Sequence, residues 1–299
     1  MNKTLIIGGT GYLGKHLYNI LTKTSSEVYI TSRFENNNKN CFIFDLSDIN
    51  SYKNIDFKCF DRIFMLASTM EGIKSKILDE NTFEINCNSY KNFLNHLVKI
   101  DFINQLIYIS SMTVYSVNNE SPVSENGSTE LQPNSYGLSK LIAEKLTKYY
   151  SKENKFKAVI IRIPGLFGSD RKSGFIYNAV QKISKNLDFY ISTENLKYWE
   201  TISVLDASSM IEVFINRYNW KKDYDVFNIS YGHETDMIDL AYFIKDYFKS
   251  KSAILLTSPK DYTTFFLSNK KFLNITNNYT KNFKNSLLEY INSIVKWNL

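Results

Sequence analysis

The hydrophobic positions in the first half of the chain form short apolar runs separated by stretches with helical spacing. The apolar runs cover residues 4–7, 28–31, 41–44, 62–67, 106–110 and 158–163, and the helical stretches cover 11–23, 81–100 and 133–150. Strands that are apolar throughout, and that alternate with helices, are typical of a parallel sheet covered on both faces. The pattern therefore predicts an α/β fold with a doubly wound parallel sheet.

The pattern becomes less regular after about residue 165. Helical segments are expected near 175–186, 206–218 and 236–249, and the apolar run 226–230 predicts a strand that returns to the main sheet. At roughly 150 residues per domain, the 299 residues agree with two domains. We expect a sheet domain over 1–165 and a smaller α+β lobe over 166–299. Ligands of open α/β sheets bind at the carboxyl edge of the strands, so the lobe is expected to hold a substrate there.

Composition excludes several classes of protein. Hydrophobic residues make up 43% and charged residues 22% of the chain, which excludes intrinsic disorder. No apolar run is long enough to span a bilayer, and residues 1–9 lack the apolar core of a secretory signal, so we expect a cytoplasmic protein with no membrane partner. Three cysteines without a CxxC pair and three scattered histidines predict neither a disulfide scaffold nor a metal site.

The net charge of +6 is concentrated near the end of the chain. Residues 249–299 contain eight lysines, two acidic residues and no arginine. Specific phosphate contacts usually use the forked guanidinium of arginine, so this segment favours a solvated lysine face over a nucleic-acid site. The positive field would still attract an anionic small-molecule substrate.

A glycine-rich turn lies between the first predicted strand and the first helix. Gly8 permits a tight turn, Gly11 lets the backbone approach a pyrophosphate, and Gly14 allows the helix to pack close to the strand. The N–H groups at the start of the helix then face the anion. A purely structural turn is the alternative, because the spacing is GxxGxxG rather than GxGxxG. We expect a dinucleotide-binding turn that also includes Thr10, Tyr12 and Leu13.

The end of the second strand bears on the choice of dinucleotide. An acidic residue at this point favours NAD, because it accepts hydrogen bonds from the adenosine ribose. This chain has Ser32 and Arg33 instead, which suit a 2′-phosphate. NADP is therefore the expected cofactor, with NAD possible if Arg33 is only an exposed residue at a strand end.

A serine pair and a YxxxK sequence supply the candidate catalytic groups. Ser110 and Ser111 end a strand, and Tyr136 and Lys140 lie one turn apart on one face of a helix. A tyrosine with a pKa near 10 is a poor base, but a nearby ammonium and a cationic nicotinamide lower that pKa. Ser111 can hydrogen-bond to the substrate oxygen that gains or loses the proton.

With these motifs in this order, the sequence resembles the extended short-chain dehydrogenase/reductase family of nucleotide-sugar epimerases, dehydratases and reductases. The resemblance extends over nearly the entire chain and implies a Rossmann domain over 1–165. It implies Ser111, Tyr136 and Lys140 as catalytic residues, with Tyr136 and Lys140 also contacting the cofactor. Further cofactor contacts that it implies are Asp45, Leu46, Leu66, Ala67, Ser68, Asn86, Ser110 and Pro164.

Departures from the family pattern reduce the number of candidate reactions. Dehydratases of the family carry an Asp-Glu pair where this chain has Met112 and Thr113, so dehydration is disfavoured. Gly165 replaces an asparagine of the RxxN segment, and Trp199 stands where an arginine commonly grips the substrate diphosphate. Arg171 could replace that arginine. The candidate substrate residues are Ser111, Thr113, Gly165 and Arg171.

Three functions follow from this comparison. The first is the NADPH-dependent reduction of a keto group on a deoxy nucleotide sugar, which the Ser32-Arg33 pair favours. The second is a C4 epimerase that uses the same three residues with tightly held NAD. The third is a scaffold that senses a dinucleotide without catalysis, which an intact catalytic set disfavours. The resemblance also implies a homodimer formed by the helices near 81–100 and 136–150.

Overall fold

A seven-stranded sheet forms the centre of the computed structural model, which describes residues 2–24, 27–74, 77–116, 118–154, 156–192, 199–257 and 265–297. The strand order is β10-β6-β5-β4-β1-β2-β3, and every neighbouring pair is parallel. The strands are β1 (Lys3–Ile7), β2 (Glu27–Ser32), β3 (Cys41–Ile43), β4 (Arg62–Met65), β5 (Gln105–Ser111), β6 (Lys157–Ile163) and β10 (Tyr224–Asn228). This is the Rossmann order, which confirms the predicted fold class.

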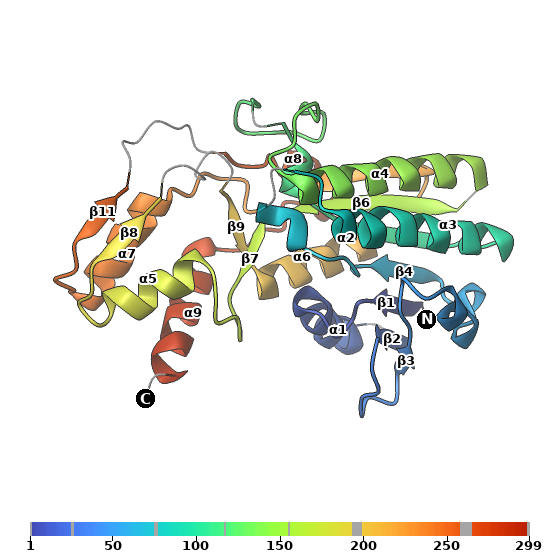
Figure 1. Cartoon of the computed structure of the whole chain (residues 1–299), viewed down its shortest axis with the longest axis horizontal. Helices are drawn as coiled ribbons and strands as arrows, with labels where there is room; N and C mark the ends of the chain where they lie inside the picture. Colours follow the sequence, from blue (N-terminus) through green and yellow to red (C-terminus); the bar gives the residue numbers. More distant parts are fainter. Residues whose placement is uncertain are drawn as a thin grey trace.

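Helices cover both faces of the sheet, because its strands are apolar on both sides. One face carries α2 (Glu80–Phe83), α3 (Tyr90–Lys99) and α4 (Ser135–Asn154), and the other carries α1 (Tyr12–Thr24) and α6 (Val204–Arg217) (Figure 1). The short helix α8 (Lys270–Thr276) packs with α6 on the second face. No helix in the described part of the chain is both long and apolar enough to cross a membrane.

Parts of the chain after residue 165 return to the sheet. Strand β10 pairs with β6 at the edge of the sheet, and α6 packs against α1 through Ala207, Met210, Ile211 and Phe214. From the sequence we expect only the strand to return to the sheet. Helix α6 returns to the sheet as well, because its apolar side chains pack in one core with those of α1. The division of the chain at residue 165 remains a prediction.

A second, smaller lobe lies at the carboxyl edge of the sheet (Figure 1). It consists of α5 (Phe175–Ile183), α7 (Met237–Phe248), α9 (Phe283–Trp297) and the paired strands β8 (Phe189–Ile191) and β11 (Ile254–Leu256). The three helices share an apolar core that includes Val180, Ile183, Leu240, Ile244 and Ile291. The short strands β7 (Gly165–Phe167) and β9 (Thr201–Ser203) connect this lobe with the sheet.

The topology fixes where a ligand of the sheet would bind. The strand order reverses between β1 and β4, and open α/β sheets bind ligands at the carboxyl ends of the strands beside such a point. The turn after β1 contains the glycines, and the chain after β4 runs beside it: the Leu66 and Ala67 N–H groups both donate to the Ile7 carbonyl, at 2.9 and 3.1 Å. Strand β4 consequently ends at Met65, two residues before the predicted end.

Candidate active site

The glycine turn between β1 and α1 leaves little room for side chains. Gly8 has a φ of +86°, which residues with a side chain rarely adopt, and a Cβ there would lie 2.8 Å from the Ala67 nitrogen. A Cβ on Gly14 would lie 2.3 Å from the Gly8 carbonyl oxygen. Gly8 therefore makes the turn and Gly14 brings α1 close to it, as their spacing predicts.

Unlike Gly8 and Gly14, Gly11 faces solvent. It is exposed, and a Cβ there would meet only the Gly8 carbonyl oxygen, at 3.2 Å. It directly precedes α1, whose first turn presents N–H groups with no partner inside the helix. The backbone at Gly11 is thus open to an anion at a helix N-terminus, which fits the pyrophosphate of a dinucleotide.

The two residues expected to select the cofactor lie at the carboxyl end of β2. Ser32 is buried, and its hydroxyl accepts a hydrogen bond of 3.2 Å from the Phe34 N–H. Arg33 is exposed, and its guanidinium carbon lies 5.8 Å from the centre of the Phe34 ring. Just after the next strand, β3, the Asp45 carboxylate accepts a hydrogen bond from the Ser47 N–H, and Leu46 is buried in the core.

Asn86 lies where the helix beside the site changes its hydrogen-bonding pattern. Residues Glu84–Ser89 form a π-helical segment between α2 and α3, a distortion frequent at functional sites. The Asn86 amide is buried and exchanges hydrogen bonds with the backbone of Thr69, at 2.9 and 3.0 Å, and also donates to the Ser139 hydroxyl. Asn86 thereby connects the segment after β4 to the helix that carries Tyr136 and Lys140.

The two serines at the end of β5 have different partners. Ser110 points into the protein and donates a hydrogen bond of 2.6 Å to the Glu144 carboxylate. Ser111 is half-buried and caps the short 3₁₀ turn Met112–Val114. The Ser111 hydroxyl oxygen accepts hydrogen bonds from the Thr113 N–H at 3.2 Å and from the Thr113 hydroxyl at 2.9 Å.

The start of α4 places Tyr136 and Lys140 beside this turn. Both side chains are buried, with exposed fractions of 8% and 2%. The Lys140 ammonium lies 4.4 Å from the centre of the Tyr108 ring and 6.0 Å from that of Tyr136. Gly137 makes the approach possible, because a Cβ there would lie 2.1 Å from the Thr113 carbonyl oxygen.

Burial dominates the ionisation of both groups. It raises the pKa of Tyr136 to about 12, although a hydrogen bond with Ser68 acts in the opposite direction. It lowers the pKa of Lys140 to about 7, against the attraction of Glu144 and Cys87. From the sequence we expect Lys140 to lower the pKa of Tyr136. With the protein groups alone, the pKa of Tyr136 is raised instead, because the buried surroundings disfavour charge on both side chains.

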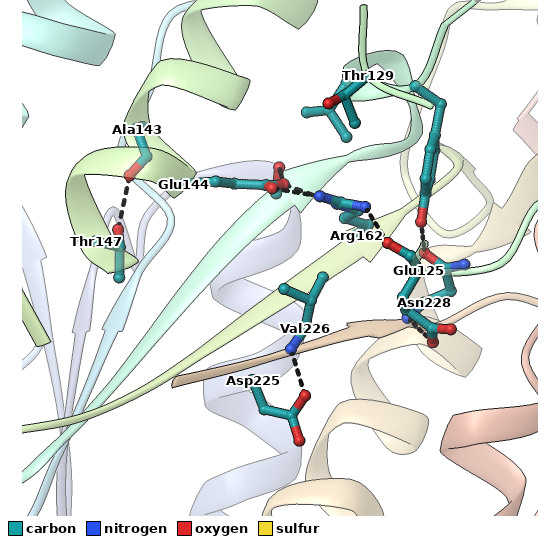
Figure 2. Close-up of polar contacts among 12 residues, drawn as sticks. Glu125, Thr129, Ala143, Glu144, Thr147, Arg162, Asp225, Val226 and Asn228 are labelled. Carbon is teal, nitrogen blue, oxygen red and sulfur yellow. Dashed lines mark hydrogen bonds and ion pairs between the residues drawn. The ribbon is translucent and has the colours of Figure 1, made fainter. Parts of the chain in front are cut away.

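A buried ion pair holds the helix that carries Tyr136 and Lys140 against the sheet. The Arg162 guanidinium, on β6, binds the Glu144 carboxylate, on α4, through two hydrogen bonds of 2.9 and 2.6 Å (Figure 2). Arg162 also donates to the Glu125 carbonyl, and the Glu125 carboxylate accepts the Asn228 N–H. The network joins α4 to three segments beside it: β6, β10 and the loop that precedes α4.

The candidate substrate residues in the second half lie along the edge between the sheet and the lobe. Pro164 and Gly165 directly follow β6, and the exposed Gly165 donates its N–H to the Glu200 carbonyl. Arg171 donates to the Leu166 carbonyl, and its guanidinium carbon lies 5.5 Å from the centre of the Tyr12 ring. Its charge thus lies near the start of α1.

Among the described residues, Trp199 has no polar contact that would replace a diphosphate-binding arginine. Its ring packs edge-on against Phe175, with ring centres 5.6 Å apart, and belongs to the core of the lobe. The residue that follows it, Glu200, is buried to 2% exposure.

Three residues that shape the site were not singled out as site residues in the sequence analysis. Gly9 is one, because a Cβ there would lie 2.4 Å from the Ile30 side chain. Gly137 and Glu144 are the others. Glu144 follows Lys140 by four residues, so helical spacing could have placed it on the catalytic face of α4. The need for glycine at 137 depends on the distant Thr113 and left no local pattern.

Comparison with known proteins identifies the family. The profile of the NAD dependent epimerase/dehydratase family matches residues 4–230. The chain is 25% identical over 273 residues to a provisionally named UDP-glucose 4-epimerase of Methanocaldococcus jannaschii, and the match covers 86% of each protein. It is 28% identical over 286 residues to the dTDP-4-dehydro-6-deoxyglucose reductase of Escherichia coli, and this match covers 86% of the chain and 85% of the reductase.

Solved structures share the whole fold. RMD from Pseudomonas aeruginosa, complexed with NADPH, superposes with a TM-score of 0.82 at 20% identity, over 99% of this chain and 100% of that one. The UDP-glucose 4-epimerase of Thermotoga maritima with UDP-glucose gives a TM-score of 0.82 at 17% identity, with the same coverage. The profile match runs from the first strand of the sheet to just beyond the last, and this chain therefore belongs to the NAD dependent epimerase/dehydratase family, as an enzyme of the extended short-chain dehydrogenase/reductase type.

Proposed function

We propose that this enzyme reduces a keto group on a nucleotide-linked deoxy sugar with NADPH. The observation that carries the choice of NADPH is the carboxyl end of β2, where the exposed Arg33 guanidinium follows the Ser32 hydroxyl. A guanidinium binds a phosphate through charge-assisted hydrogen bonds, whereas an NAD site usually has a carboxylate there. The similarity to a dTDP-4-dehydro-6-deoxyglucose reductase supports the same reaction.

Each catalytic residue has a role that its surroundings support. When bound, the nicotinamide supplies the hydride that adds to the carbonyl carbon. Tyr136 gives its phenolic proton to the carbonyl oxygen, which suits a side chain that burial keeps protonated at neutral pH. Ser111 donates a hydrogen bond to the same oxygen. Lys140 holds the nicotinamide ribose and compensates the phenolate that Tyr136 becomes.

The remaining site residues fit this proposal. Gly8, Thr10, Gly11, Tyr12, Leu13 and Gly14 would cradle the pyrophosphate at the start of α1. Asp45 and Leu46 would contact the adenine, and Leu66, Ala67 and Ser68 would lie beneath the adenosine ribose. Asn86, Ser110 and Pro164 would line the nicotinamide side. The substrate would lie against Gly165 and Arg171, between the sheet and the lobe.

Epimerisation at C4 is the second candidate, favoured by the provisional UDP-glucose 4-epimerase among the relatives. An epimerase oxidises and then reduces the same carbon, so it must retain its cofactor, whereas a reductase exchanges NADP for NADPH in every turnover. The bound nucleotide therefore distinguishes the two reactions.

The test is to denature the purified protein and identify any released dinucleotide by mass. We expect an empty site that then binds NADPH more tightly than NADH, and oxidation of NADPH when dTDP-4-dehydro-6-deoxyglucose is added. Arg33→Ala should remove most of the preference for NADPH. Stoichiometric NAD, with interconversion of UDP-glucose and UDP-galactose, would establish the epimerase instead, and binding of neither dinucleotide would favour a scaffold.

A homodimer through α3 and α4 and a cytoplasmic location belong to the same proposal. Tyr149 on α4 is 63% exposed, and a second copy packed on these helices would cover it. Sedimentation of the purified protein tests the dimer. Tyr149→Asp should convert a dimer formed by these helices into monomers.

A further inference from the structure

We propose that Thr113 is a positioning residue that orients the hydroxyl of Ser111, so that the hydrogen of Ser111 is directed at the substrate oxygen. This inference rests on the proposed function, because it assigns Thr113 a role in carbonyl chemistry by Ser111 and Tyr136. It differs from the substrate contact expected from the sequence, in which Thr113 would touch the substrate itself.

The hydrogen bonds of Ser111 carry the inference. A serine hydroxyl has one hydrogen to donate and two lone pairs that accept. Thr113 supplies a donor to each lone pair, its N–H at 3.2 Å and its hydroxyl at 2.9 Å. The Ser111 hydroxyl can then only donate its own hydrogen. Ser111 is half-buried at the carboxyl end of β5, on the edge of the sheet where the substrate is expected.

The two donors of Thr113 are themselves held in place. The Thr113 side chain is 9% exposed, and its residue lies in the 3₁₀ turn that Ser111 caps. The Thr113 carbonyl is packed against Gly137, where even a Cβ would not fit. The neighbouring Ser110 hydroxyl already donates to Glu144. Ser111 is therefore the hydroxyl at this strand end that is left for the substrate, and Thr113 cannot easily turn away from it.

We expect the orientation of the Ser111 hydroxyl by Thr113 to increase the rate of the reaction. As the hydride adds to the carbonyl carbon, negative charge develops on the oxygen, which then takes the proton of Tyr136. A donor that already points at that oxygen stabilises the charge without having to reorient during the reaction. A Ser111 hydroxyl with one free lone pair could rotate and accept from elsewhere, and its hydrogen would then be misdirected for part of the time.

The test is a double-mutant cycle on NADPH oxidation with dTDP-4-dehydro-6-deoxyglucose. Thr113→Val keeps the shape and the N–H but removes the hydroxyl, and we expect kcat to fall about 10-fold, a part of the ~10²-fold loss expected for Ser111→Ala. The KM for the sugar should change less than about two-fold. In the Ser111→Ala background, Thr113→Val should have almost no further effect, because no hydroxyl remains to be oriented.

Two further variants separate orientation from structure. Thr113→Ser returns the hydroxyl and should restore most of the lost turnover. Thr147→Val is the matched control: Thr147 is also buried, and its hydroxyl donates to the Ala143 carbonyl within α4. This control should leave kcat unchanged. Equal losses from Thr113→Val in both backgrounds, a rise in KM alone, or unchanged kcat would each overturn the inference.

A crystal structure of Thr113→Val beside the wild type gives a readout that needs no substrate. We expect one side-chain rotamer of Ser111 in the wild type and a rotated or divided one in the variant. An unchanged Ser111 rotamer in Thr113→Val would contradict the inference. If the wild type reduces no keto-sugar nucleotide, the proposed function fails, and the rotamer comparison still decides whether Thr113 orients Ser111.

Discussion

At the scale of single residues, burial decides which polar side chains of the site can carry a charge. Tyr136 and Lys140 lie in the same buried region, where the pKa of the phenol is raised to about 12 and that of the ammonium is lowered to about 7. Desolvation penalises the charged form of each group. In the proposed reduction the proton is thus already on Tyr136, where the reaction needs it.

Replacement of that proton donor is the most direct test of the mechanism. Tyr136→Phe should lower kcat by about 10²-fold or more, because no other acid in the proposed site is positioned to replace the phenol. The dissociation constant for NADPH should stay within a few-fold, as measured by fluorescence titration. Unchanged turnover would show that Tyr136 is not the acid.

At the scale of secondary-structure elements, the position of α4 decides whether the catalytic groups meet. Helix α4 carries Tyr136 and Lys140, and it touches the 3₁₀ turn after β5, where Gly137 meets Thr113. The same helix is fastened to β6 by the pair of Glu144 and Arg162. Two predictions concern these attachments.

Gly137→Ala tests the close contact. Alanine favours a helix over glycine by roughly 0.5–1 kcal/mol, but its Cβ would lie 2.1 Å from the Thr113 carbonyl oxygen. Overpacking of this kind costs about 1–3 kcal/mol, so the variant should be less stable. Displacement of Tyr136 should lower kcat at least about 10-fold. Urea unfolding and turnover check both effects, and Lys145→Ala on the exposed face of α4 should change neither.

Glu144→Gln tests the buried ion pair. The Glu144 and Arg162 side chains are 2% and 6% exposed, so removal of one charge leaves the other buried without compensation. The free energy of unfolding should fall by about 3–5 kcal/mol. Asp223→Asn is the matched control, since it breaks an exposed pair with Lys157 on the same strand. That loss should be at most about 1 kcal/mol, and equal losses in the two variants would contradict the prediction.

At the scale of the whole molecule, Glu200 couples the lobe to the sheet. Its backbone carbonyl accepts the Gly165 N–H after β6, and its carboxylate accepts the Leu267 N–H at 2.9 Å. The other carboxylate oxygen is buried with no hydrogen-bond partner among the described residues. Burial raises the pKa of Glu200 to about 8, although hydrogen bonds from Leu267 and Ser230 lower it.

This raised pKa predicts how stability depends on pH. Because the folded pKa lies above the ordinary value of 4.5, the folded protein binds the extra proton between about pH 4.5 and 8. The stability that this proton contributes is complete below about pH 4.5, falls as the pH rises from there, and is lost once the pH has risen through about 8.

Glu200→Gln keeps the shape and remains neutral, so this part of the pH dependence should disappear. At pH 9 the variant should be more stable than the wild type by about 1–3 kcal/mol, which is a rise in melting temperature of several degrees. At pH 4, below the ordinary pKa of 4.5, the two proteins should melt within a degree or two of each other. Calorimetry at the two pH values measures both differences, and identical pH profiles would show that Glu200 does not titrate in this range.

The sequence by itself determined the parallel sheet and the glycine turn, and it predicted the three side chains that we propose as catalytic. These depend on local signals: apolar runs, glycine spacing, and the separation of four residues that places Tyr136 and Lys140 on one helical face. Only the tertiary structure decided that α6 returns to the sheet, that Gly137 lies against Thr113, and that Glu144 pairs with Arg162. Those contacts join segments far apart in the chain, and a hydrogen bond or a close approach between such segments leaves no periodic pattern in the sequence.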